Sequence, residues 1–144
     1  MSPILIINQI YKNSVNISIF IVWLFHITAM LGVTLGYQDW FVSKTPINLF
    51  LIFLLLLWNF PKKSLRLGIA IGVFFIVGML FEWLGVHYGL FFGNYTYGNN
   101  LGPKFFGVPW FIGVNWAVLT IVSASIASSL FESKIARVFL GAGL

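Results

Sequence analysis

Hydrophobic residues fill four long runs of the chain, and short polar connections separate these runs. The runs cover residues 14–36, 46–60, 65–88 and 108–130. A helix of about 20 apolar residues, rising about 1.5 Å per residue, crosses the roughly 30 Å hydrocarbon core of a bilayer. The pattern therefore predicts an all-α, polytopic bundle of about four transmembrane helices. The second run is the shortest and requires a nearly upright helix or a thinner bilayer.

Both ends of the chain carry shorter apolar stretches. Pro3 and the four aliphatic residues after it are too few to cross a bilayer, and they predict a short interfacial helix within residues 1–13. A fifth apolar segment begins at Val138 and stops at Leu144. Because the chain stops just as a span begins, we expect a fragment or a shortened protein.

The basic residues in the connections predict the orientation of the helices. Lys12, Lys62, Lys63, Arg66, Lys134 and Arg137 fall on one side of the predicted membrane, and Lys44 and Lys104 fall on the other. Lys and Arg concentrate on the cytoplasmic side of membrane proteins. The N-terminus is therefore predicted to lie inside, and the connection of residues 89–107 outside. We expect one membrane domain over residues 1–144.

Composition supports a lipid environment for most of the surface. Hydrophobic residues make up 60% of the chain and charged residues 8%, whereas soluble domains carry about 25% charged residues. We therefore expect a multi-pass protein of the cell (inner) membrane. The net charge of +5 follows from the basic connections, and no recognition motif for nucleic acid accompanies it. The chain has no cysteine, which excludes disulfides, iron–sulfur clusters and thiolate zinc sites.

Small residues four positions apart predict faces where helices pack closely, because lipid offers no hydrophobic drive for helix association. The pairs are Gly32 and Gly36, Gly68 and Gly72, Gly85 and Gly89, and Ala124 and Ser128.

Glu82 and His26 are the two ionisable residues well inside the predicted spans. Such residues are costly in a membrane and are candidates for function. With no cation at its depth, the Glu82 carboxyl is expected to stay protonated near neutrality and to be able to donate a proton. The competing interpretation is a structural carboxyl that forms a hydrogen bond with Asn115, at similar depth, or with a loop amide. His26 is either a proton relay or a neutral, hydrogen-bonded side chain.

His87 stands five residues after Glu82, so the two side chains converge only if Gly85 permits a local bulge in the helix. Two histidines and one carboxylate without ligand spacing are a poor metal-binding set, so no metal is expected.

The connection of residues 89–107 combines aromatic residues with turn-forming glycines and prolines, which exclude a long helix. One interpretation is an aromatic belt at the membrane interface. The other is a lid over an outward-facing pocket lined by Tyr95, Tyr97 and Trp110. A lid can lie at membrane depth only if protein buries it or it lines a cavity.

Several segments between residues 82 and 116 form a compound pattern of one glutamate, glycines, tyrosines and Gly-Val-Pro. They are Glu82-Trp-Leu-Gly85-Val-His-Tyr-Gly89, Phe92-Gly93-Asn-Tyr95-Thr-Tyr97, Leu101-Gly102-Pro103, Gly107-Val108-Pro109 and Asn115-Trp116. Together these segments resemble the carotenoid biosynthesis membrane-protein family. Its characterised members are the γ-carotene 1′,2′-hydratases of bacteria and the bisanhydrobacterioruberin hydratases of archaea. Family members usually continue past the point where this chain stops.

The resemblance implies hydration of the terminal double bond of a carotene, without a cofactor. In that reaction Glu82 is the acid, and Asn115 or His87 holds the water. Aromatic rings stabilise the carbocation by cation–π interaction. The candidate rings are those of Trp83, Tyr95, Tyr97, Trp110 and Trp116. The expected partners are a lipid-soluble carotenoid and the bilayer, with a second copy or other pathway enzymes as further candidates.

Two other functions remain open at this point. The first is a non-catalytic subunit that binds carotenoids or isoprenoids. The second is part of a proton-coupled transporter, although the chain has neither an inverted repeat nor a pair of broken helices.

Overall fold

The computed structural model describes residues 3–60, 65–91, 93–130 and 132–143. Lys62 and Lys63 of the orientation count, and Phe92 of the family resemblance, lie outside the described residues. The chain divides into two compact units, Met1–Lys63 and Ser64–Leu144, and each unit is considered by itself. The single membrane domain therefore stays a prediction.

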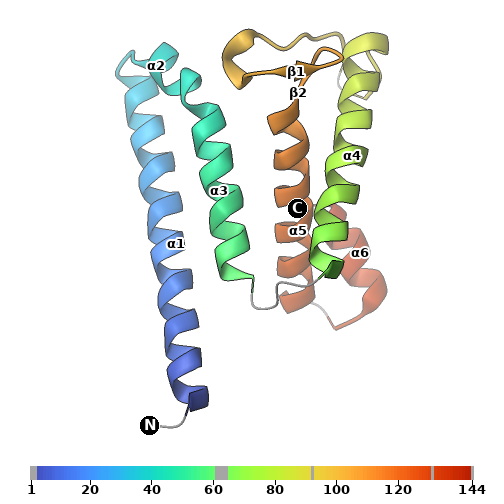
Figure 1. The fold of residues 1–144 in the computed structure, drawn as a ribbon. Helices are drawn as coiled ribbons and strands as arrows, with labels where there is room; N and C mark the ends of the chain where they lie inside the picture. The colour runs from blue at the N-terminus through green and yellow to red at the C-terminus, as the bar shows by residue number, and fades with distance from the viewer. Residues whose placement is uncertain (1–2, 61–64, 92, 131, 144) are drawn as a thin grey trace. The chain divides into compact units, whose positions relative to one another are not determined.

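The first unit consists of two long antiparallel helices joined by a short one (Figure 1). The helices are α1 (Pro3–Thr34), α2 (Gln38–Ser43) and α3 (Thr45–Asn59). The separate interfacial helix expected at residues 1–13 is wrong, because α1 is already continuous from Pro3. No glycine or proline interrupts the sequence between Pro3 and Gly32, so nothing ends the helix there.

Gly36 ends α1 and turns the chain toward α2. Its φ is +91°, a left-handed conformation that glycine adopts without steric cost. The amide of Tyr37 donates to the carbonyl of Gly32, and the amide of Gly36 donates to that of Val33. This pair of hydrogen bonds is the Schellman motif, which satisfies carbonyls at a helix C-terminus.

The second unit contains three helices, α4 (Leu65–Tyr88), α5 (Trp110–Leu130) and α6 (Lys134–Ala142). The predicted run of residues 65–88 coincides with α4. The run of residues 108–130 becomes α5 from Trp110 onward, because the first two residues form a strand. Figure 1 shows α4 and α5 side by side along their length, with α6 folded back beside the end of α5.

A small hairpin closes the connection between α4 and α5. After a short 3-10 helix, η1 (Asn99–Leu101), strand β1 (Lys104–Phe105) pairs antiparallel with β2 (Val108–Pro109). The two turn residues, Phe106 and Gly107, both have positive φ, as a tight type I′ hairpin turn requires. Among the described residues of this connection, 89–91 and 93–107, there is no long helix, as predicted.

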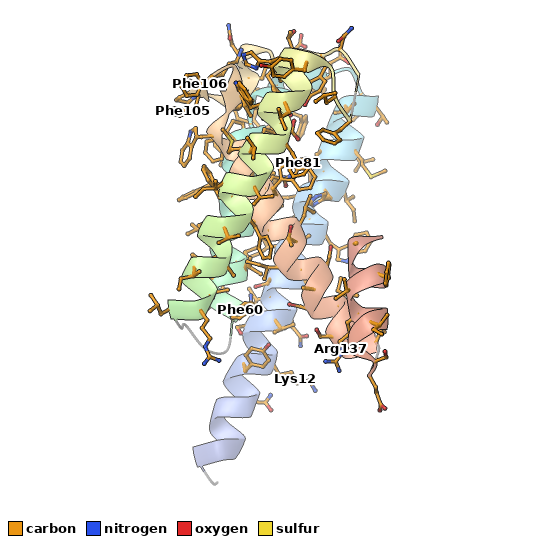
Figure 2. All side chains as sticks on the ribbon, turned by 90° about the vertical axis from the view of Figure 1, so that its right-hand side faces the viewer. Lys12, Phe60, Phe81, Phe105, Phe106 and Arg137 are labelled. Carbon is orange, nitrogen blue, oxygen red and sulfur yellow. The ribbon has the colours of Figure 1, made fainter. Side chains whose placement is uncertain are left out.

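The two strands of the hairpin differ in burial. Val108 and Pro109 are fully buried, and β2 contacts both α4 and α5. Phe105 and Phe106 are 67% and 73% exposed and point away from the helices (Figure 2). The hairpin is therefore anchored to the helix pair by β2 and presents an aromatic tip.

Gly78 and Gly113 allow α4 and α5 to approach closely. A Cβ on Gly78 would lie 2.4 Å from Trp116 Cβ, and a Cβ on Gly113 would lie 2.7 Å from Met79 Cγ. Neither glycine belongs to the pairs predicted from four-residue spacing.

The predicted small-residue pairs have mixed outcomes. Gly32 packs against the Phe41 ring, and Gly85 and Gly89 pack against loop side chains. Within its own unit, no described atom lies within 4 Å of a Cβ placed on Gly68 or Gly72. Ala124 and Ser128 are exposed in the second unit. The spacing is present on every one of these helix faces, but only the tertiary fold decides which face meets a neighbour.

The last helix differs from the fifth span expected from Val138. The helix α6 begins four residues earlier, at Lys134, and packs against α5. A Cβ on Gly141 would lie 3.3 Å from Ala127 Cβ, so this glycine sits at the contact. Gly141 thus faces α5, whereas Ile135, Val138 and Phe139 are 71%, 69% and 76% exposed within the described structure.

Three helical segments within the described ranges are long and apolar enough to cross a membrane: Tyr11–Thr34, Leu65–Tyr88 and Trp110–Leu130. The fourth predicted span, α3, is a shorter apolar helix. The chain is therefore an all-α membrane helical protein, as predicted.

Candidate active site

Glu82 is a buried carboxyl near the end of α4, with 7% of its surface exposed. Its Oε2 accepts hydrogen bonds from the hydroxyls of Tyr95 and Tyr97, each at 2.6 Å. Its Oε1 accepts a hydrogen bond of 2.9 Å from the indole Nε1 of Trp116. All three donors are uncharged, and together they satisfy both carboxyl oxygens.

Two glycines on α4 admit the side chains that bind Glu82. Gly78, one turn before Glu82, leaves space for the Trp116 side chain of α5. Gly85, almost one turn after Glu82, lies beneath Tyr95, whose hydroxyl would be 2.6 Å from a Cβ at that position. A larger residue at either position would displace a donor from the carboxyl.

Lys104 fixes the loop segment that supplies Tyr97. Its Nζ donates to the backbone carbonyl of Tyr97 at 2.5 Å and lies 3.4 Å from Asn99 Oδ1. The rings of Tyr95 and Tyr97 meet edge to face, with centroids 5.5 Å apart. The loop thus presents both hydroxyls to the same carboxyl oxygen.

The two tyrosines are held in their neutral form. Burial, followed by the hydrogen bond to Glu82 and the charge of that group, raises the pKa of Tyr95 to about 12. The same causes, with burial again the largest, raise the pKa of Tyr97 further above its ordinary value. Both hydroxyls therefore remain hydrogen-bond donors throughout the physiological pH range.

An open cleft of about 460 Å³ adjoins the carboxyl. Ile112, Asn115, Trp116 and Leu119 form one wall, at the spacing of a single face of α5. Glu82, Tyr95 and Tyr97 complete the lining. The cleft therefore combines one carboxyl, one amide, three aromatic rings and aliphatic surface.

The structure brings together five of the eight predicted site residues: Glu82, Asn115, Tyr95, Tyr97 and Trp116. Asn115 lines the cleft, but the three hydrogen bonds recorded for Glu82 come from the two tyrosines and Trp116. The carboxyl is therefore bound by Tyr95, Tyr97 and Trp116, and not by Asn115 as the alternative interpretation expected.

His87, Trp83 and Trp110 are not among the lining residues of the cleft. His87 is exposed, its Nδ1 is 3.0 Å from the carbonyl of Trp83, and its ring lies beside the indole of that residue. Trp110 is 41% exposed and packs against Phe111.

His26 belongs to the first unit, where it is exposed on α1. Its Nδ1 is 2.8 Å from the carbonyl of Val22, one turn earlier. The ring is therefore hydrogen-bonded within its own helix.

Two contributions to the site were missed by sequence reasoning. Trp116 was expected to supply a ring, and its N–H also binds the carboxyl. Ile112 and Leu119 were not singled out, although they stand three residues before Asn115 and three after Trp116 on the same helix face. That helical spacing was the signal that could have identified them.

In the described part of the chain, no three His, Asp or Glu side chains come together.

A family model described as carotenoid biosynthesis protein matches residues 43–142, more than two thirds of the chain. The chain belongs to the carotenoid biosynthesis protein family. The match contains every residue that lines the cleft, and the role of this carotenoid biosynthesis protein lies in that pathway. No curated protein and no solved structure matches the chain.

Proposed function

We propose that this carotenoid biosynthesis protein is a cofactor-free hydratase that adds water to the terminal double bond of a carotene. We also propose that it is a multi-pass protein of the cell (inner) membrane. The observation that carries the first proposal is the buried carboxyl of Glu82, bound by three uncharged donors beside a cleft with aromatic and aliphatic walls.

In the first step, the protonated Glu82 transfers its proton to the less substituted carbon of the double bond. The π electrons form the new C–H bond, and a tertiary carbocation remains on the other carbon. Negative charge develops on Glu82 as the proton leaves. The donors of Tyr95, Tyr97 and Trp116 are already aimed at the two oxygens that gain this charge, so no reorganisation is needed.

Aromatic rings in the cleft stabilise the carbocation. Tyr95, Tyr97 and Trp116 all line the cleft that contains the carboxyl. A cation over a desolvated aromatic face gains roughly 2 kcal/mol or more. Among the five predicted rings, these three are therefore the ones we assign to this role.

In the second step, a water molecule donates an oxygen lone pair to the carbocation and forms the new C–O bond. The Glu82 carboxylate then takes a proton from the resulting oxonium group. The acid is regenerated, and the net change is the addition of one water, with no oxidant or reductant. Asn115 lines the same cleft, and its amide can both donate to and accept from that water.

The apolar surface of the cleft suits the end of a long polyene. A volume of about 460 Å³ is typical of pockets for drug-sized molecules, so one end of the carotene enters and the rest stays in lipid. Ile112 and Leu119 provide aliphatic contacts for that end. Entry from the bilayer explains why a membrane fold performs this reaction.

The test is the Glu82→Gln variant in a host that makes acyclic or monocyclic carotenes. The glutamine retains an acceptor oxygen but has no acidic proton, so we expect loss of the product that is one water heavier in mass. The exposed loop residue Glu132 provides the matched control, and Glu132→Gln should retain the product.

Membrane levels of all variants are compared by immunoblot, so that loss of activity is separated from loss of protein. Hydrated product from Glu82→Gln at the wild-type level would overturn the proposed role of Glu82. A pigment that copurifies with the wild-type protein without any change in mass would instead identify a carotenoid-binding subunit.

A further inference from the structure

The aromatic tip of the hairpin, Phe105 and Phe106, leaves most of two phenyl rings uncovered. The residues are 67% and 73% exposed, and their rings meet edge to face with centroids 4.8 Å apart. In Figure 2 both side chains point away from the helices of the second unit. Most of the surface of both rings is therefore left for a partner outside this unit.

The backbone of the turn does not explain why Phe106 is aromatic. Its φ is +48°, a left-handed conformation that is unfavourable for a bulky residue. Asparagine, aspartate and glycine form such hairpin turns more readily. A phenylalanine at this position therefore indicates a contact made by its ring.

Contacts of Gly107, the second residue of the turn, give the depth of the aromatic tip. A Cβ on Gly107 would lie 3.6 Å from Val86 Cγ1 and 3.8 Å from His87 Cε1, so the turn lies beside the last turn of α4. The 24 residues of α4 rise about 36 Å, slightly more than the roughly 30 Å of hydrocarbon in a bilayer. The last turn of a helix that spans the bilayer therefore lies near the boundary with the lipid headgroups, and the aromatic tip lies at the same level.

Two further aromatic residues mark this level on the helices themselves. Tyr88 ends α4 and is 64% exposed, and Trp110 begins α5 and is 41% exposed. Tyrosine and tryptophan concentrate where a membrane meets water. Val108 and Pro109, both fully buried, connect the turn to Trp110 and keep it at this depth.

We propose that Phe105 and Phe106 insert into the boundary between lipid headgroups and acyl chains and anchor the hairpin in the bilayer. Burial of the two apolar rings among acyl chains stabilises this position. The anchor also supports the candidate site. Lys104 directly precedes the aromatic tip, and its Nζ donates to the carbonyl of Tyr97, whose hydroxyl donates to Glu82. The anchor does not depend on the chemistry proposed for Glu82.

The first experiment measures the depth of the aromatic tip in phosphatidylcholine nanodiscs. Because the chain has no cysteine, Phe105→Cys and Phe106→Cys each create a single site for a nitroxide spin label, and each keeps the other phenylalanine. Oxygen concentrates in lipid and a nickel chelate stays in water, so power-saturation EPR with both reagents reports depth. Ile76→Cys, exposed midway along α4, and Asn100→Cys, exposed in η1, calibrate the scale.

We expect both labels in the aromatic tip to lie about 5–10 Å deeper than the label at Asn100 and nearer the surface than the label at Ile76. Reagent access equal to that at Asn100 would overturn the proposal, since the tip would then lie in water. Poor access of both reagents would also overturn it, because the tip would be buried against protein. Each label position tests the depth by itself, so the result stands if one variant does not fold.

The second experiment tests the support that the anchor gives to Tyr97. The double variant Phe105→Ser, Phe106→Ser removes the aromatic tip, and Phe139→Ser, at a residue of α6 that is 76% exposed, is the matched control. Tyrosinate absorbance is followed in nanodiscs as the pH is raised. We expect the late-ionising tyrosines to ionise at lower pH in the double variant and at the wild-type pH in Phe139→Ser. An unchanged titration of the double variant would overturn the support of Tyr97, and the EPR depth decides the anchor separately.

Discussion

Glu82 accepts hydrogen bonds from Tyr95, Tyr97 and Trp116, which belong to two different parts of the chain, the hairpin loop and α5. Each hydrogen bond comes from an uncharged donor and ends on one of the two carboxyl oxygens. Together the three donors fix the position of the carboxyl beside the cleft.

Removing one tyrosine hydroxyl should slow the reaction without abolishing it. Tyr95→Phe and Tyr97→Phe each delete one donor to Oε2, and a hydrogen bond to a charged group contributes about 1.5–3 kcal/mol. We expect hydrated product to fall roughly 10- to 100-fold in each variant. Tyr88→Phe, at an exposed residue outside the cleft, should leave product formation unchanged and serves as the control. Wild-type rates in both loop variants would contradict the role of these donors.

The raised pKa values of the two loop tyrosines predict how the site responds to alkali. Because the pKa of Tyr95 rises from about 10 to about 12 on folding, its contacts stabilise the protein fully below pH 10. That contribution is lost as the pH rises toward 12. For Tyr97, whose pKa is raised further, the loss comes at still higher pH.

Alkaline titration of the detergent-solubilised protein, followed by tyrosinate absorbance, measures this behaviour. We expect wild type to show late-ionising tyrosines that disappear when both residues are replaced by phenylalanine. Identical titration curves for the wild type and the double variant would count against the hydrogen bonds to Glu82.

Much of the site could be predicted from residue types, and helix phase explains most of the rest. An acid in a membrane span and tyrosines in the next loop were sufficient to select Glu82, Tyr95 and Tyr97. Trp83 follows Glu82 by one residue and is turned about 100° around the helix, which directs it away from the cleft. His87 is turned by about 140°, and α4 has no bulge that would bring it back. The hydrogen bond from the Trp116 N–H to Glu82 could not be predicted from the sequence, because it depends on how α4 and α5 pack.

At the scale of elements, the α4–α5 contact and the hairpin together build the site. The helix pair brings Trp116 to Glu82, and β2 anchors the loop on both helices. Lys104, at the start of β1, ties the hairpin to the backbone of Tyr97. The tyrosines therefore reach the carboxyl from a loop that is fixed at several points.

Gly78 should be sensitive to substitution because Trp116 Cβ would lie 2.4 Å from its added methyl group. We expect Gly78→Ala to destabilise the protein by about 1–3 kcal/mol, the usual cost of overpacking. Gly68→Ala is the matched control, since no described atom of its unit is near, and alanine favours helix by about 1 kcal/mol. Thermal unfolding in one detergent, followed by circular dichroism, compares the two variants. Equal melting temperatures would contradict the close contact at Gly78.

The helices of this chain could be predicted more accurately than its short elements. Long apolar runs between turn residues predict the first and last residues of α3 and α4 to within one position. By contrast, α2 has six residues and β1 and β2 have two each, too few for a periodic signal. The sequence predicts a span from Val138, whereas α6 begins at Lys134 and packs against α5, because hydropathy does not distinguish a helix that packs against its neighbour from one that crosses the membrane.

At the scale of the whole molecule, family membership and the apolar helices agree on a membrane protein of carotenoid biosynthesis. Within the second unit, the hairpin with Lys104 lies at one end and Arg137 of α6 at the other (Figure 2). The positive-inside rule places the hairpin end, and with it the cleft, on the outer side. This orientation stays a prediction, and it would bring water to the site from the outer membrane surface.

The most direct test of the central claim follows the atoms of water into the product. The purified protein in nanodiscs is given a carotene in water labelled with heavy oxygen, and separately in deuterated water. We expect the product to contain one heavy oxygen on the tertiary carbon and one deuterium on the neighbouring carbon, and Glu82→Gln to form neither. A product whose oxygen does not come from water, or equal labelling with Glu82→Gln, would contradict acid-catalysed hydration at Glu82.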